Sequence, residues 1–420
     1  MNLTRYASGL ATFMLIAWRN MWRQRRRSLV VISSMAVGIF AMIFSIGFMN
    51  GMTLQMVENT INTTLGHISV HHEGYRQSMK LKYNFFPEER YYHALEGTKG
   101  VVAYAPRVKI KGMISSSETS RGIMLVGIDP ARERAVSSIG DYTITDNGGR
   151  FLNDPSSDDL LISKTLAEKL DLRVGERAVL RVVDENSEMT GVALTVAGLY
   201  ESPVEAFDSF VVFTGINRLQ EITGLGNNIS EIIVRTKNRD AVDGVKKRLV
   251  GSIAAPGLEI LTWKEMEPSL VSYIKLQDKI VYIFFLIMFI TVIFSIANTL
   301  IMSIMERFHE LGVMKCIGTR PSHIFFMVIF EAINLGMVGL VAGLAITVPL
   351  VIILGITGID FAFAVDAMRK WKIGTTIYPL ILIKDIVAAT AIVLITTVVA
   401  SLYPAVKAAR IKPLEALHFI

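Results

Sequence analysis

The chain has 420 residues, of which 51% are hydrophobic and 19% are charged, and its mean hydropathy is +0.45. Soluble domains are about a quarter charged, so this composition argues against a purely soluble enzyme and excludes a disordered or collagen-like chain. Residues 59–271 hold 25 Lys/Arg and 28 Asp/Glu, whereas the rest of the chain holds 18 and 9. The sequence therefore predicts a water-soluble middle between apolar, basic ends.

The N-terminal segment is basic and precedes the first long apolar run. We predict an interfacial helix over residues 10–21, with Phe13, Trp18 and Trp22 at headgroup depth and a block of arginines against anionic lipid. A signal peptide is not indicated, because the basic block follows the short apolar run instead of preceding it. Residues 1–27 are thus assigned to a cytoplasmic or interfacial elbow helix.

Four apolar stretches are long enough to cross about 30 Å of hydrocarbon, which takes roughly 20 residues. The expected fold class is a membrane protein with four transmembrane α-helices and a large α+β extracytoplasmic domain between the first two. The apolar stretches are residues 29–49, 280–305, 324–356 and 386–403, the last ending at Pro404. The expected division of the chain is 1–27 elbow, 28–58 first span and stalk, 59–271 domain, 272–305 stalk and second span, 306–321 coupling loop, 322–357 third span, 358–384 short outer loop, 385–404 fourth span and 405–420 tail.

Basic residues near the span ends predict the orientation, because cytoplasmic loops carry an excess of Lys and Arg. Three cations in the loop between the third and fourth spans argue mildly for the opposite orientation, namely Arg369, Lys370 and Lys372. Eight cations at the two ends of the chain outweigh them, namely Arg19, Arg23, Arg25, Arg26, Arg27, Lys407, Arg410 and Lys412. We therefore expect both termini and the 306–321 loop in the cytoplasm and the 59–271 domain outside.

Short β-rich runs and helical patterns alternate through residues 59–271, which predicts a mixed α+β domain with two subdomains. The centre, about residues 113–228, is expected to be inserted into a βαβ-like unit that the flanks form. Polar stalks at residues 50–64 and 262–278 are expected to extend the first two spans outward as continuous helices. Two helices would then tether the domain and could transmit motion to it.

No motif for catalysis or nucleotide binding occurs in the sequence, which lacks a P-loop, a zincin motif and a G-x-S-x-G elbow. His67, His71 and His72 are more often surface or core groups than metal ligands. The single cysteine, Cys316, cannot form a disulfide within the chain and leaves the compartment open. We expect no catalytic residue, no metal, no cofactor bound by this chain and no nucleic-acid partner.

Small residues inside the spans predict close helix packing or a dimer interface, although glycine is also simply tolerated in membrane helices. The two small-xxx-small pairs are Gly47/Gly51 and Gly339/Gly343. Candidates for contact with acyl chains lie near the outer end of the first span, and ordinary packing or lipid contact is the alternative for each. They are Met42, Phe44, Phe48 and Met52.

Glu331 is an acid inside the third span. A carboxylate in hydrocarbon needs a partner or water, and either snorkelling or a partner such as Asn298 or Arg320 would satisfy it. A proton relay needs a chain of such groups, which the other spans do not offer. A structural or coupling role is therefore favoured over proton transport.

The loop at residues 306–321 has helical spacing between two spans. Phe308, Leu311 and Met314/Lys315 fall on neighbouring turns, while Gly318 can end the helix and Pro321 can begin the next one. The charges of Glu306, Arg307 and Glu310 fall on the other side. Such an amphipathic helix suits a groove on a cytoplasmic partner, and a merely solvated connector is the alternative.

The motif E-R-x-x-E-L-G-x-x-K-x-I-G-T-R in this loop resembles the coupling segment of ABC-transporter permeases of the MacB/FtsX/lipoprotein-releasing (LolC/LolE-like) superfamily. Four other segments resemble the same family, in the right order along the chain. They are the elbow at residues 17–28, the G-H-I-x-V-H motif at 66–71, the L-I-S-x-x-L-A motif at 161–167 and the C-terminal Y-P-A-x-x-A-A-R-x-x-P-x-E-A-L at 403–417.

The resemblance implies a bacterial inner-membrane permease that dimerises with a second copy or a paralogue. It also implies a separate ABC ATP-binding subunit, which holds ATP and Mg, and a mechanism in which ATP-driven closure moves the stalks and the periplasmic domain. The ATPase contacts that it implies are Glu306, Arg307, Glu310, Lys315 and Gly318, and the glycine pair Gly47/Gly51 would help to line the dimer interface.

Lipoprotein release toward a periplasmic chaperone is the leading hypothesis for the function. One feature weakens it, because residues 184–191 are predicted to form only a short turn where the chaperone-gripping permease carries an extended hook. A partner permease without the hook, or a homodimer, would explain the difference. The alternatives are a MacB-like efflux permease that uses an adaptor and an FtsX-like signalling platform that controls a cell-wall hydrolase.

Overall fold

The computed structural model describes residues 17–19, 21–23, 25–184, 187–253 and 255–412, and these form two compact units. The membrane unit contains the described residues up to Thr53, Ile274–Ile359 and the described residues from Ile377 on. The soluble unit contains Leu54–Tyr273 and also Asp360–Thr376. Most of the predicted interfacial helix lies outside the described residues, and so does the end of the C-terminal motif.

Four helices in the described residues are long and apolar enough to cross a membrane, as predicted. They are α2 (Arg25–Thr60), α11 (Pro268–Glu306), α13 (Pro321–Thr357) and α15 (Ile383–Ala409). The predicted end of the last span at Pro404 is wrong, because α15 continues to Ala409. A proline removes one backbone hydrogen bond from a helix, and here the loss does not end it.

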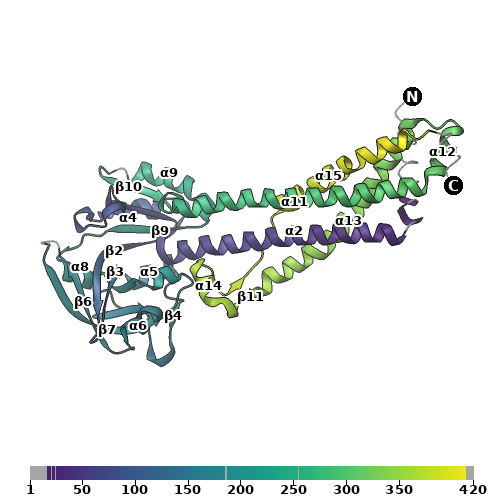
Figure 1. Ribbon diagram of the computed structural model, residues 1–420. Helices are drawn as coiled ribbons and strands as arrows, with labels where there is room; N and C mark the ends of the chain where they lie inside the picture. Colours follow the sequence, from purple (N-terminus) through teal and green to yellow (C-terminus); the bar gives the residue numbers. More distant parts are fainter. Residues whose placement is uncertain (1–16, 20, 24, 185–186, 254, 413–420) are drawn as a thin grey trace. The chain divides into compact units, whose positions relative to one another are not determined.

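Helices α2 and α11 belong to both units. The boundary of the soluble unit falls inside each of them, at Leu54 and Tyr273, and Figure 1 draws each as one unbroken ribbon. A π-helical turn, Ile61–Leu65, follows α2 directly. The predicted stalk at residues 50–64 is therefore a helical extension of the first span. The predicted stalk at residues 262–278 is continuous with the second span only from Pro268 on, because Glu267 separates α11 from a short helix at Trp263–Met266.

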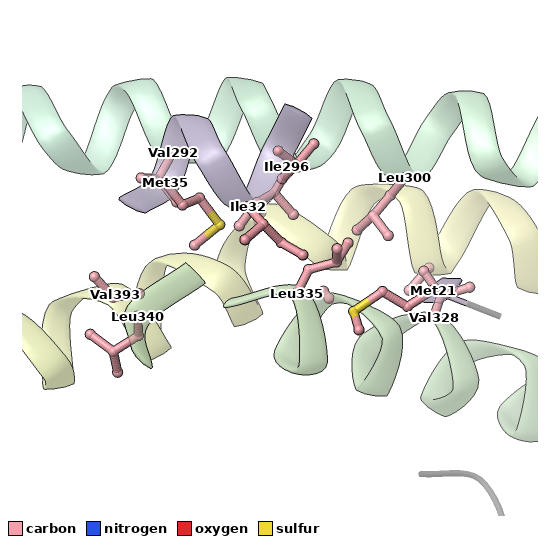
Figure 2. Close-up of a cluster of buried hydrophobic side chains, with 14 of the residues drawn as sticks. Met21, Ile32, Met35, Val292, Ile296, Leu300, Val328, Leu335, Leu340 and Val393 are labelled. Atoms are coloured by element: carbon pink, nitrogen blue, oxygen red, sulfur yellow. The ribbon is translucent and has the colours of Figure 1, made fainter. Parts of the chain in front are cut away.

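The core of the membrane unit draws side chains from all four long helices (Figure 2). Three glycines of α13 allow the helices to approach closely, because a Cβ atom on any of them would collide with a neighbour. Gly336 faces Thr397 of α15, whereas Gly339 and Gly343 face Met35 and Ile39 of α2. The cluster includes Ile32, Met35, Val292, Ile296, Leu300, Val328, Leu335, Leu340 and Val393.

In the described residues, the soluble unit is built on one ten-stranded sheet. Nine strands follow the order β10-β1-β9-β2-β3-β8-β5-β7-β4, and the tenth, β6, pairs with β2 and β7. The strands are β1 (Ile68–His72), β2 (Val101–Ser115), β3 (Ser120–Ile128), β4 (Thr143–Ile144), β5 (Asp159–Ser163), β6 (Arg177–Val183), β7 (Met189–Tyr200), β8 (Val211–Gly215), β9 (Glu231–Thr236) and β10 (Leu258–Thr262). The helices include α3 (Tyr75–Ser78), α4 (Glu89–Gly97), α5 (Pro130–Val136), α6 (Lys164–Leu170), α7 (Glu205–Asp208), α8 (Ile216–Thr223), α9 (Val242–Ser252) and α10 (Trp263–Met266).

The flanks of this unit form two split βαβ motifs. Strand β1 is antiparallel to both β9 and β10, and β9 is antiparallel to β2. Helix α4 therefore joins the parallel pair β1 and β2, and α9 joins the parallel pair β9 and β10. The insert, from β3 to α8, lies in the chain between β2 and β9.

The insert is not a separate subdomain with its own sheet. Strand β2 has 15 residues, and its first half pairs with β9 of the flank while its second half pairs with β3 and β6 of the insert. The predicted boundary at residue 113 therefore falls inside a strand. A single long strand carries the hydrogen bonds of both parts, which no local turn signal in the sequence could reveal.

Two short helices connect the long ones. Helix α12 (Phe308–Cys316) lies in the chain between α11 and α13. Helix α14 (Val365–Lys370) lies between α13 and α15, flanked by the paired strands β11 (Ile359–Asp360) and β12 (Thr376–Ile377). The sequence predicted only a short outer loop for this second connection, whereas Asp360–Thr376 packs as part of the soluble unit.

Candidate partner-docking site at α12

Local sequence signals place α12 between its long neighbours. The residue Arg307 precedes it, and Pro321 stands in the first turn of α13, where a missing N–H costs nothing. Gly318 has φ +93°, a left-handed conformation that favours glycine, and its N–H donates to the Lys315 carbonyl. The predicted helix and its end at Gly318 match this geometry.

The apolar face of α12 is turned into the membrane unit. Leu311 is 2% exposed, and Phe308 and Met314 pack half-buried against the core cluster of that unit. This face is used for packing within the chain, so a partner that binds α12 must meet another side of the helix.

The charged residues of α12 and its flanks are held by ion pairs. Arg27 Nη2 donates to Glu306 Oε1 at 2.5 Å, and Arg23 pairs with Glu310. Arg307 Nε donates to Glu310 Oε2 at 3.3 Å. The hydrogen bond from Arg23 lowers the pKa of the Glu310 carboxyl, with a smaller contribution from Arg307. Because these groups are partly exposed, water screens them and each pair stabilises only weakly.

Glu331 takes partners that the sequence analysis did not name. Ser303 Oγ donates to its Oε1 at 3.2 Å and Arg307 Nη1 to its Oε2 at 3.4 Å. The candidates Asn298 and Arg320 were wrong, because Ser303 in the last turn of α11 and Arg307 directly after that helix are four residues apart and present adjacent donors. Arg307 thus bridges Glu310 of α12 and Glu331 of α13.

Lys315 binds the end of the last span. Its Nζ donates to the carbonyl oxygens of Ala409 at 2.6 Å and Ile411 at 2.7 Å. A cation at the C-terminus of a helix satisfies free carbonyls and opposes the helix dipole. Together with Arg307, Lys315 ties α12 to α11, α13 and α15.

The outward side of α12 is an apolar stripe that the sequence analysis missed. Ile317 is 79% exposed and Val313 is 39% exposed, and His309, Cys316 and Gly318 are exposed around them. Val313 and Ile317 are four residues apart and therefore share one face. That spacing was a usable signal, but the predicted ATPase contacts Glu306, Arg307, Glu310, Lys315 and Gly318 did not include either residue.

The predicted glycine pairs pack within the chain. A Cβ atom on Gly51 would lie 2.1 Å from the Tyr378 carbonyl oxygen, and one on Gly47 would lie 3.2 Å from an Ile381 side-chain carbon. Gly339 and Gly343 are covered by α2, as described above. Close packing is thus the role that the geometry gives all four, while the dimer interface stays a prediction.

The four candidates for acyl-chain contact differ in exposure. Met42 is 4% exposed and belongs to the core of the membrane unit, so its assignment was wrong. Phe44, Phe48 and Met52 are half-exposed. Phe44 stacks between Phe40 and Phe48, with ring centroids 5.8 and 6.4 Å away. The i, i+4 spacing of Phe40 was the missed signal for this aromatic row.

The histidines of the soluble unit have protein partners. His71 is buried, with its Nε2 2.9 Å from Glu259 Oε1 on β10, and His72 Nδ1 lies 2.8 Å from the Glu73 carbonyl oxygen. Burial lowers the pKa of His67 to about 4, helped by the nearby charges of Arg235 and Arg239. Among the described residues, no group of three or more His, Cys, Asp or Glu side chains could hold a metal ion.

Two family models match the chain in succession. The MacB-like periplasmic core domain matches residues 28–251, which is just over half of the chain, and the FtsX-like permease C-terminal domain matches residues 282–413. The second match spans α12 and the two long helices after it.

Similar proteins cover nearly the whole chain. The lipoprotein-releasing system transmembrane protein LolC of Neisseria meningitidis is 22% identical over 93% of this chain and 94% of its own length. The corresponding LolE of Haemophilus influenzae is 20% identical over 96% of this chain and 98% of its own. Among solved structures, the periplasmic region of MacB from Actinobacillus actinomycetemcomitans aligns with a TM-score of 0.35 at 12% identity, over 51% of this chain and 97% of that one. The chain therefore belongs to the MacB/FtsX/LolC–LolE superfamily of ABC-transporter permeases, inner-membrane proteins with a periplasmic domain that work with an ATP-binding partner subunit.

Proposed function

We propose that this chain is the non-catalytic permease of a lipoprotein-releasing transporter, and that ATP hydrolysis on a separate subunit moves its periplasmic domain. Proteins named as lipoprotein-releasing transmembrane proteins align with it over almost their full length, which supports this cargo over the others. The basic residues near both termini support a cytoplasmic location for the termini and for α12. ATP and Mg then belong to the partner.

The anchored helix α12 carries this proposal. Its outward stripe of Val313 and Ile317 is apolar and exposed at the end of a membrane unit, which suits insertion into a groove of the ATPase. Arg307 and Lys315 fix the same helix to α11, α13 and α15. A displacement of α12 by the ATPase would therefore reach three long helices at once, and α11 continues into the soluble unit.

The aromatic row of Phe40, Phe44 and Phe48 is the proposed contact for the acyl chains of the cargo. These rings are half-exposed on α2, the other helix that continues into the soluble unit. A dimer, formed with a second copy or a paralogue, would bring two such rows together. A periplasmic chaperone would then take the released lipoprotein.

One observation favours a second candidate, a MacB-like efflux permease with an adaptor. Strands β6 and β7 are joined by only five residues, from Asp184 to Glu188, so this hairpin has no extended hook with which to grip a chaperone. An FtsX-like platform that controls a cell-wall hydrolase is the third candidate, and no feature of the described residues favours it over the first two.

The cargo is tested by purifying the chain with its co-expressed ATPase in lipid nanodiscs and identifying what co-purifies. Acylated proteins, released on ATP addition, are the expected result. An adaptor without acylated proteins would support the efflux permease, and a cell-wall hydrolase would support the signalling platform. Either result would contradict lipoprotein release.

The docking face is tested by Ile317→Asp and Glu310→Lys in the same complex. Both variants should abolish stimulated ATP hydrolysis and leave membrane insertion intact, because a charge enters the apolar stripe or two ion pairs are lost. Val250→Asp is the matched control, since Val250 is 49% exposed on α9 of the soluble unit. Unchanged ATP turnover in Ile317→Asp would remove α12 as the docking helix.

A further inference from the structure

The connection between α13 and α15 forms a closed loop that packs as part of the soluble unit. The loop comprises Asp360–Thr376, here called the strap, and contains α14. Phe361 N–H donates to the Thr375 carbonyl at 2.7 Å, and the strands β11 and β12 pair with each other. The two ends of the strap, one following α13 and the other leading to α15, are therefore joined by hydrogen bonds.

Arg369 binds the strap to the insert. Its guanidinium donates to Asp208 Oδ2 at 2.5 Å and to Glu201 Oε1 at 3.1 Å. The Asp208 side chain is fully buried, and that of Arg369 is 13% exposed. A buried carboxylate is costly without a charged or hydrogen-bonded partner. Ser202 Oγ and N–H supply two hydrogen bonds, at 2.6 and 3.0 Å, and among the described residues Arg369 supplies the opposing charge.

The same strap also contacts the outer ends of α2 and α11. Asn59 Nδ2 donates to the Lys372 carbonyl at 3.0 Å, and Gln55 Nε2 donates to the Thr376 carbonyl at 2.8 Å. The rings of Trp371 and Tyr273 lie 6.3 Å apart. Lys372 has φ +60°, a conformation that disfavours residues other than glycine, so surrounding contacts must hold it.

We propose that the strap is a third mechanical connection between the spans and the periplasmic domain, with Arg369 as its positioning residue. This inference rests on the proposed function. Helices α2 and α11 lead into the flank motifs, whereas the strap joins α13 and α15 to the insert through Arg369, Glu201 and Asp208. Because β2 is the one strand that the two parts share in the described sheet, the insert can pivot on it, and the strap makes that pivot follow the third and fourth spans.

The test measures the pivot directly in the complex with the ATPase. Spin labels replace two exposed lysines, Lys169 on α6 of the insert and Lys247 on α9 of the flank, in a Cys316→Ser background. The distance distribution is recorded with and without ATP and Mg. In the otherwise unaltered chain we expect an ATP-dependent shift, and in Arg369→Ala we expect that shift to be lost.

Arg369→Lys should restore the shift in part, because it keeps the charge, and Lys370→Ala is the matched control from the neighbouring position. Lipoprotein release per ATP hydrolysed should fall at least tenfold in Arg369→Ala, while ATP hydrolysis stays within about twofold of its original rate. An unchanged shift in a folded Arg369→Ala complex overturns the strap and leaves the proposed function standing. No ATP-dependent shift in the unaltered chain would overturn both.

If Arg369→Ala fails to fold, Asn59→Asp provides the second variant. It keeps the fold of α2 and removes the amide donor to the Lys372 carbonyl, so it should reduce the shift. An undiminished shift in a folded Asn59→Asp complex would also overturn the proposal.

Discussion

Helices α12 and α14 occupy equivalent places in the chain, each between two long apolar helices, and each depends on an arginine that bridges two acids. Arg307 bridges Glu310 and Glu331, and Arg369 bridges Glu201 and Asp208. An arginine bridge by itself therefore does not distinguish a docking helix from a structural one.

The two helices differ in what they leave exposed. Around α12 the exposed apolar side chains are the aliphatic Val313 and Ile317, whereas around α14 they are the aromatic Phe363 and Trp371. Aromatic side chains are enriched at membrane–water interfaces, and exposed apolar patches occur at contacts with other proteins or with membranes. The difference supports the proposal that a partner subunit covers the exposed stripe beside α12.

The largest effect on stability is expected where α2 packs against the chain segment that follows the strap. Gly51→Val would place a side chain against the backbone at Tyr378, where even a Cβ atom would lie 2.1 Å from the carbonyl oxygen. We expect a loss of more than about 4 kcal/mol, or no folded protein, measured as folded yield and thermal stability in detergent. Gly374→Ala, with nothing within 4 Å of its Cβ position, is the control. Equal stability of both variants would show that the chain is not clamped here.

The next effect concerns the buried acid under the strap. Burial raises the pKa of Asp208 to about 6, against hydrogen bonds from Ser202 and the charge of Arg369. An ordinary aspartate has a pKa near 3.8, so the folded state holds the proton more tightly than the unfolded state does. The free energy of unfolding should therefore fall as the pH rises from about 4 to about 6, by up to about 3 kcal/mol.

Asp208→Asn should lack this slope, as measured by urea unfolding in detergent between pH 4 and pH 7. The lowered pKa of His67 acts with the opposite sign over the same range, because only the unfolded state gains its proton there. The difference between the variant and the unaltered chain is thus the quantity to compare. Parallel profiles would contradict a buried, ionisable Asp208.

A smaller effect is expected at the anchor of α12. Lys315→Met removes the donor to the carbonyls of Ala409 and Ile411 and should cost about 1–3 kcal/mol of thermal stability. Lys407→Met, at an exposed position of α15, is the control. Unchanged stability with weakened ATPase binding would show that Lys315 is a docking residue, as the family resemblance implied.

The smallest effect on stability is expected on the outward stripe. Ile317→Ala should change the stability by less than about 0.5 kcal/mol, because its side chain is 79% exposed. Leu311→Ala alters a residue of the buried face of α12 and should cost about 2–4 kcal/mol of stability. ATPase affinity should fall in Ile317→Ala at unchanged stability. A large loss of stability in that variant would mean that the stripe packs within the chain.

The four spans, the soluble domain between the first two, the short helix α12 and the lack of a nucleotide-binding motif could all be predicted from the sequence. These are local properties, because span length, periodicity and motif spacing are read from adjacent residues. The errors in the predictions for Pro404 and Met42 also have a local cause. A helix tolerates a proline near its end, and one side of an apolar span packs against neighbouring helices instead of lipid.

Which side chains contact one another depends on the three-dimensional packing of distant segments. Lys315 binds carbonyls 94 and 96 residues away, and Arg369 binds an acid 161 residues away. One strand, β2, joins the two parts of the domain, and the loop after α13 packs with the soluble unit. A buried charged or polar side chain requires an interacting group. Which group it meets depends on how distant segments pack, and no local pattern in the sequence encodes that.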